Sequence, residues 1–126
     1  MTKGILWIVL IEESKQKLLE TVPAKYPVLF ANHITLFYDV ELTGEWKGLV
    51  EKRIELSLKT HCYDHQIQAV TVDIGDLPCQ NLFPHITISA QEGIKPFISN
   101  AMLQGVHSSQ YVKESLQGVV EFAEFE

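Results

Sequence analysis

The sequence predicts a single α+β domain with the element order β-α-β, two further strands and β-α-β, in which helices pack on antiparallel sheets. Its 126 residues are enough for one hydrophobic core, and 46% apolar and 21% charged residues are ordinary values for a soluble globular protein. The sequence shows no linker, repeat or low-complexity run, so one domain over residues 1–126 is expected. Runs of β-branched residues alternate with short stretches of helical spacing, which predicts the mixture of strands and helices.

The first strand and the first helix are predicted near the beginning of the chain. Residues 4–11 form a continuous apolar run, which is typical of a strand covered on both faces. Ser14 then offers an N-cap for a helix, and Pro23 ends that helix. The apolar stripe of the helix consists of Leu18, Leu19 and Val22.

The middle of the chain predicts three strands. A proline keeps residues 26–30 out of a helix, so they form a loop or an extended entry into a strand over residues 32–40. Residues 50–60 and 66–74 are both strand-like, and residues 61–65 are expected to connect them.

The last third repeats the order of the first. Pro84 introduces a strand over residues 85–90, and a helix is expected over residues 97–103, stopped by Gly105. Residues 116–125 alternate poorly, but their composition favours a final strand.

The strongest functional signal is a four-residue pattern that occurs twice, once in each half of the chain. Residues 33–36 are His-Ile-Thr-Leu and residues 85–88 are His-Ile-Thr-Ile, and both lie in predicted strands. From the composition, roughly 0.06 copies of such a pattern are expected by chance. One copy would be explained by the polar face of an amphipathic strand, whereas two copies favour a shared function.

The residue types fit phosphodiester chemistry. Side chains two positions apart share one face of a strand, so His33 projects with Thr35 and His85 with Thr87. Opening a phosphodiester needs one group that deprotonates the nucleophile and another that protonates the leaving oxygen. Two histidines supply both, because an unperturbed pKa of about 6.5 leaves both forms populated near neutral pH. The threonine hydroxyls can bond the non-bridging phosphate oxygens.

This pair of motifs resembles the signature of the two-histidine (2H) phosphoesterase superfamily, which consists of two His-x-Thr/Ser segments flanked by apolar residues. The resemblance implies a two-lobed, pseudo-symmetric domain with antiparallel sheets around a central cleft, helices on the outside and one motif in each lobe. It also implies catalytic roles for His33, Thr35, His85 and Thr87. The chain looks shorter than many members, so the loops that usually close over a substrate are expected to be trimmed.

The function predicted from these residues is a metal-independent phosphodiesterase with no cofactor. Its expected substrates are nucleotide 2′-linked or cyclic phosphodiesters: a 2′,3′-cyclic phosphate, a 2′,5′-oligoadenylate or a cyclic oligonucleotide. The sequence does not assign the acid and base roles between His33 and His85. Two alternatives remain: a non-catalytic nucleotide-binding module with the same cleft, and a metal-dependent hydrolase that uses both histidines and Asp39.

Four further residues are candidates for substrate binding. Phe37 and Ser89 fall on the histidine faces by the period of two, and Phe37 either stacks on a base or closes the rim of the core. Tyr38 and Phe83 flank the motifs and are further stacking candidates, as is Tyr26, although packing explains each of them as well.

The bulk properties set expectations for partners and compartment. A net charge of −6 with scattered basic residues favours a small nucleotide or an RNA end over a long duplex. The apolar run at residues 4–10 is too short to span a bilayer, so no membrane association is expected. Two cysteines without C-x-x-C spacing favour a reducing cytoplasm. The protein is expected to be a monomer.

Overall fold

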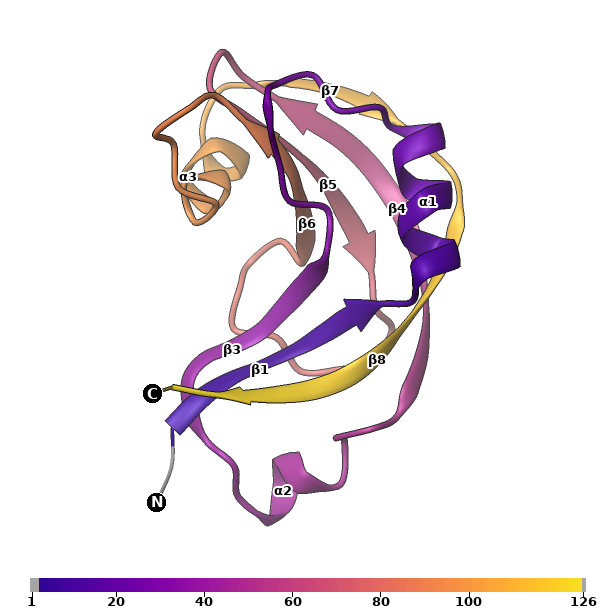
Figure 1. The fold of residues 1–126 in the computed structure, drawn as a ribbon, viewed down its shortest axis with the longest axis vertical. Helices are drawn as coiled ribbons and strands as arrows, with labels where there is room; N and C mark the ends of the chain where they lie inside the picture. Colours follow the sequence, from indigo (N-terminus) through magenta and orange to yellow (C-terminus); the bar gives the residue numbers. More distant parts are fainter. Residues whose placement is uncertain (1–2, 126) are drawn as a thin grey trace.

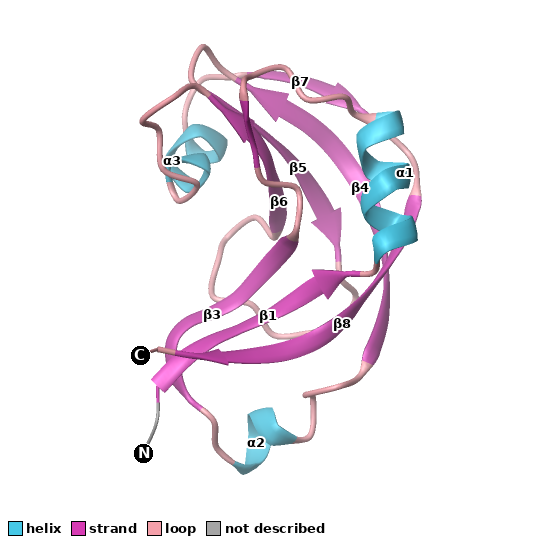
Figure 2. Ribbon diagram, in the orientation of Figure 1, coloured by secondary structure: helices cyan, strands magenta, loops and turns pink. Residues whose placement is uncertain are grey.

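The computed structural model describes residues 3–125 and consists mainly of antiparallel strands, with 46% of residues in strands and 17% in helices. The six principal strands are β1 (Lys3–Leu10), β3 (His33–Glu41), β4 (Arg53–Tyr63), β5 (Ile67–Asp73), β6 (His85–Ala90) and β8 (Ser115–Glu124). The short strands are β2 (Val28–Leu29), which pairs with β6, and β7 (Ser108–Tyr111), which pairs with β4. The helices are α1 (Glu12–Thr21), α2 (Gly44–Lys47) and α3 (Ile98–Gln104) (Figure 2).

The principal strands form one sheet that closes on itself (Figure 1). Their order is β6-β3-β1-β8-β4-β5, and β5 pairs again with β6, which completes a six-stranded barrel. Strand β3 pairs with β6 at a single position, Ile34 with Ile86, and the chain just before it is held by hydrogen bonds from the Phe30 and Ala31 amides to carbonyls of β6. The two motif-bearing strands are therefore neighbours.

The expected two-lobed α+β domain with outer helices is wrong. The long strand β4 explains the difference, since Arg53–Ser57 pairs with β8 and Ser57–Tyr63 pairs with β5. One strand thus carries the hydrogen-bonded ladder from one half of the sheet to the other, and no boundary separates two lobes. The helices are few and short, so they do not form an outer layer.

The predicted strands and the last helix have observed bounds within three residues of the expected ones, but α1 begins earlier than expected. Its N-cap is Ile11, and Ser14 lies inside the helix, where its hydroxyl accepts a hydrogen bond from the Gln117 amide at 2.8 Å. Two acidic residues in the first turn, Glu12 and Glu13, favour this start because they lie at the positive end of the helix dipole.

Two short elements were not predicted. Helix α2 has only four residues, and β7 is a polar strand whose residues are all exposed, so neither carries an apolar pattern. In addition, residues 61–63 belong to β4 and not to the connection that follows it.

Two apolar clusters stabilise the structure. The larger one draws on all six principal strands and on α1; its fully buried members include Leu6, Ile8, Leu18, Ile34, Leu36, Ile86, Ile88 and Val120. The smaller one joins α3 to β4, β5 and β6 through Cys62, Ile67, Ala69, Ala90, Met102 and Leu103. Within residues 3–125, none of the helices has the length and apolar content that crossing a bilayer requires.

Candidate active site

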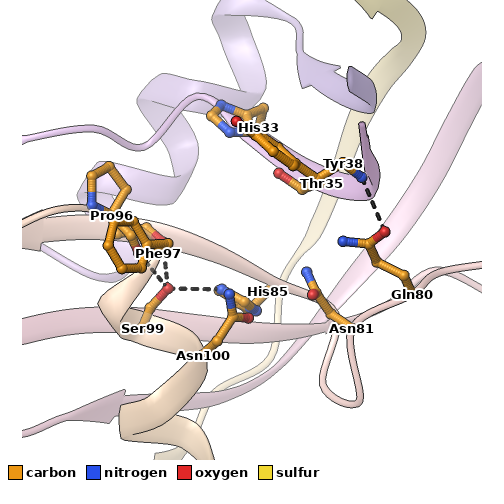
Figure 3. A pocket seen from close by; sticks show the side chains of 11 residues that line it. His33, Thr35, Tyr38, Gln80, Asn81, His85, Pro96, Phe97, Ser99 and Asn100 are labelled. Atoms are coloured by element: carbon orange, nitrogen blue, oxygen red, sulfur yellow. Dashed lines mark hydrogen bonds between the residues drawn. The ribbon is translucent and has the colours of Figure 1, made fainter. Parts of the chain in front are cut away.

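The two His-x-Thr motifs open into one cavity of about 250 Å³ (Figure 3). His33 and Thr35 line it from β3, and His85 and Thr87 line it from β6. The remaining lining residues come from β3, from the connection between β5 and β6, and from the segment that forms α3: Tyr38, Gln80, Asn81, Pro96, Phe97, Ser99 and Asn100. Among residues 3–125, no Lys, Arg, Asp or Glu lines the cavity.

Strand β3 carries one extra residue directly after its threonine. Thr35 and Phe37 lie opposite two adjacent residues of β1, which leaves Leu36 without a partner. Such a bulge interrupts the alternation of faces. Phe37 consequently lies outside the cavity and packs against Trp46 with ring centroids 4.6 Å apart, whereas Tyr38 lines the cavity.

Strand β6 has the same irregularity at the equivalent position. Thr87 and Ser89 lie opposite two adjacent residues of β5, which leaves Ile88 without a partner. Ser89 is fully buried outside the cavity, and its hydroxyl donates to Gln68 Oε1 at 2.5 Å. The expectation that Phe37 and Ser89 share the histidine faces therefore fails at both motifs for one reason, a bulge after the threonine.

The His85 ring is held at both nitrogens. Its Nδ1 lies 2.7 Å from the Phe83 carbonyl oxygen, which requires a proton on Nδ1, and its Nε2 lies 2.9 Å from Ser99 Oγ. Only 8% of the residue is exposed. Burial lowers the pKa of His85, and the hydrogen bond to the Phe83 carbonyl counteracts part of that effect.

His33 has a different environment. Its ring lies against the indole of Trp7, with centroids 4.3 Å apart, and no hydrogen bond to the ring is found within residues 3–125. Burial lowers the pKa of His33, and repulsion by the charged form of His85 lowers it further. Both imidazoles line the same cavity, so a charge on one disfavours a charge on the other.

Ser99 connects the second motif to α3. Its fully buried hydroxyl donates to the Pro96 carbonyl at 2.7 Å and lies 2.9 Å from Thr87 Oγ1, in addition to its contact with His85. Because the Ser99 hydroxyl donates its hydrogen bond to the Pro96 carbonyl, its oxygen acts only as an acceptor towards His85 and Thr87. The arrangement therefore suits a protonated His85 ring.

The two aromatic candidates that flank the motifs lie differently from Tyr38. The Phe83 ring does not line the cavity of the histidines but lies beside a neighbouring one, and 41% of the residue is exposed. Its backbone, not its ring, acts on the site through the bond to His85. Tyr26 lies outside the cavity, and its hydroxyl bonds the Asp64 carbonyl.

The described part of the chain offers no set of ligands for the metal-dependent alternative. Asp39 is exposed, has a positive φ of 60° and does not line the cavity. No group of three or more His, Cys, Asp or Glu side chains within residues 3–125 is arranged to hold a metal ion.

Comparison with known protein families matches residues 6–125, which include both motifs and the whole cavity, to a family model. The chain belongs to the fungal tRNA ligase phosphodiesterase domain family. This family is a 2H phosphoesterase family, so the resemblance found in the sequence is confirmed. A search of curated proteins found no match.

Membership of the phosphodiesterase domain family identifies the chain as a 2H-type phosphoesterase with a cyclic-phosphodiesterase type of activity. Sequence reasoning missed part of the cavity of this phosphodiesterase domain, namely Gln80, Asn81, Pro96, Phe97, Ser99 and Asn100. These residues lie in a connection and around a short helix, where no periodic pattern distinguishes a cavity residue from a surface residue.

Proposed function

We propose that the protein hydrolyses a cyclic or 2′-linked nucleotide phosphodiester without a metal, with His33 as the general base and His85 as the general acid. The observation that carries this proposal is that both imidazole–hydroxyl pairs line the same cavity. Two strands that are distant in sequence place them there, as the 2H chemistry requires.

The assignment of roles rests on the hydrogen bonds. His85 has an acceptor at each ring nitrogen, the Phe83 carbonyl and the Ser99 hydroxyl, which satisfies the doubly protonated ring. Burial lowers the pKa of both histidines, and repulsion by the charge on His85 lowers the pKa of His33 further, so His33 is neutral when His85 is protonated. One neutral and one charged histidine is the state that acid–base catalysis needs.

For a 2′,3′-cyclic phosphate, the proposed reaction is hydrolysis of one of the two bonds between phosphorus and ribose oxygen. His33 takes a proton from a water molecule, the water oxygen forms a bond to phosphorus, and the bond from phosphorus to one ribose oxygen breaks. His85 gives its proton to that leaving oxygen, so the product is a phosphomonoester with a free hydroxyl. Thr35 and Thr87 are positioned to bond the non-bridging oxygens.

The cavity favours a phosphodiester with a single negative charge. No Lys or Arg of the described residues lines it, and the protein carries a net charge of −6, so a polyanionic duplex gains little electrostatic attraction here. A small nucleotide or the end of an RNA strand is the substrate class that this balance supports.

The test is turnover of nucleoside 2′,3′-cyclic phosphates, 2′,5′-oligoadenylates and cyclic oligonucleotides in the presence of EDTA. We expect product from at least one class, and a loss of at least about 100-fold in kcat for His33→Ala and for His85→Ala. His65→Ala is the matched control, because His65 is exposed and does not line the cavity. Full activity of the double variant, or an absolute requirement for metal, would contradict the proposal.

A further inference from the structure

A second cavity, of about 340 Å³, lies beside the cavity of the histidines and shares part of its wall. The shared residues are Gln80, Asn81 and Asn100, and we refer to their three side chains as the amide cluster. A substrate whose phosphate reaches the histidines therefore has these amides next to the rest of the molecule.

The connection between β5 and β6 that carries Gln80 and Asn81 is tied to the strand of the first motif. The backbone amide of Gln80 donates to the Leu36 carbonyl at 2.8 Å. The side-chain oxygen Oε1 of Gln80 accepts from the backbone amide of Tyr38 at 3.1 Å (Figure 3). Cys79 Sγ donates to the Thr35 carbonyl at 3.4 Å. These bonds fix the first part of the amide cluster relative to β3.

Asn100 is tied to the second motif, because it follows Ser99 on α3 and Ser99 Oγ lies 2.9 Å from His85 Nε2. Both parts of the amide cluster are thus anchored to the strands that carry the histidines. The backbone segments that carry the cluster therefore have a defined position relative to the two histidines.

The amide cluster has unused hydrogen-bonding capacity. The side chains of Asn81 and Asn100 are partly exposed, and no hydrogen bond occupies either of them within the described residues. Each can therefore offer one acceptor and two donors. Because Gln80 Oε1 already accepts from Tyr38, Gln80 offers its NH₂ group.

Among the described residues, the other wall of the second cavity is apolar apart from Gln104. Leu82 is 72% exposed and Phe83 is 41% exposed, and both line it together with Leu103. In the part of the chain that the structure describes, no Lys, Arg, Asp or Glu lines this cavity, so these residues provide no countercharge for a second phosphate. A flat, neutral ring with a polar edge matches such a site, since its face can lie on the apolar wall and its edge can bond the amides.

From this juxtaposition we propose that the amide cluster reads the nucleobase of the nucleotide whose phosphate lies between His33 and His85. The proposal rests on the proposed function. Asparagine and glutamine amides pair bidentately with base edges, and a good pair discriminates by about 1–3 kcal/mol. This corresponds to a preference of at least about fivefold between bases.

The test compares kcat/KM for the 2′,3′-cyclic phosphates of adenosine, guanosine, cytidine and uridine with that for 1-O-methylribose 2′,3′-cyclic phosphate, which has no base. We expect the best nucleotide to exceed the base-free compound and the worst nucleotide by at least about fivefold. In the double variant Asn81→Ala Asn100→Ala, these ratios should fall towards one. Gln91→Ala removes an exposed amide outside both cavities and should leave the ratios unchanged.

Ratios near one in the wild type, or ratios that the double variant leaves intact, would overturn the amide-cluster proposal while the proposed function stands. If none of the five compounds is turned over, the proposed function fails for this substrate class. The subsite is then judged by the same five compounds as ligands in calorimetric titration. Base-dependent affinity that the double variant abolishes supports it, and equal affinity for all five overturns it.

Discussion

Replacing Ser99 by alanine tests the geometry of the second motif most directly. The substitution removes one buried hydroxyl that contacts His85 Nε2 and Thr87 Oγ1 at 2.9 Å each and the Pro96 carbonyl at 2.7 Å. All three of these partners belong to residues that line the cavity, so they can be hydrated once the hydroxyl is gone. We therefore expect a loss of only about 1 kcal/mol in the free energy of unfolding, or about 4 °C in Tm.

The effect on activity should be larger than the effect on folding. Without Ser99 Oγ, the protonated His85 ring loses the acceptor at Nε2. A hydrogen bond to a charged group is worth about 1.5–3 kcal/mol, so kcat should fall by at least about tenfold. Because the charged ring is the form that loses a partner, the pKa of His85 should fall, and the alkaline limb of the kcat profile should move to lower pH.

The assay is a pH series of kcat on the best cyclic nucleotide, with Tm measured in parallel. Ser99→Thr retains a hydroxyl and should restore the alkaline limb, and Ser109→Ala on the exposed strand β7 should change neither quantity. A folded Ser99→Ala protein with the wild-type kcat and pH profile would refute the role of Ser99 as a positioning residue for His85.

Three other outcomes follow from the structure. Burial lowers the folded-state pKa of His33, His61 and His85, so the unfolded chain binds more protons than the folded one below about pH 6.5. Urea unfolding at a series of pH values should therefore show full stability above that pH and a decline below it. A flat profile would contradict the burial of these three histidines. Ser89→Ala should cost about 1–3 kcal/mol in chemical denaturation, because the half-buried Tyr26 amide loses its acceptor and the buried Gln68 Oε1 keeps only the Lys25 amide as a donor. The kcat of the folded protein should stay within about twofold. A Cβ at Gly118 would lie 2.8 Å from the Val9 carbonyl oxygen, so Gly118→Ala should cost about 1–3 kcal/mol, whereas Gly44→Ala, which meets nothing within 4 Å, should unfold at nearly the wild-type Tm.

The strands could be predicted from the sequence because their signal is local. A continuous apolar run marks β1, and the proline before His85 marks the start of β6. The closure of the sheet could not be predicted in the same way. It depends on β4 being long enough to pair with both β8 and β5, and a sequence pattern shows the faces of a strand but not its partners.

The prediction that Phe37 and Ser89 project with the histidines shows where sequence periodicity ends. The period of two holds from His33 to Thr35 and from His85 to Thr87, and then a bulge adds one residue in each strand. A bulge is set by the register against the neighbouring strand, which a single sequence does not reveal. The same bulge explains why Tyr38 lines the cavity, although the period of two predicts that Phe37 faces it.

The way in which β3 leaves β6 has a consequence for how the substrate range of this protein can change. Strand β3 lies beside β6 up to the pair Ile34–Ile86, and beyond it the two strands diverge. Cys79 and Gln80, in the connection between β5 and β6, bond to β3 where the strands separate. The separation of β3 from β6 is thus set by this connecting segment and not by the catalytic strands themselves. Substitutions or insertions in that segment can resize the entrance for a larger or smaller nucleotide while the reacting groups stay in register.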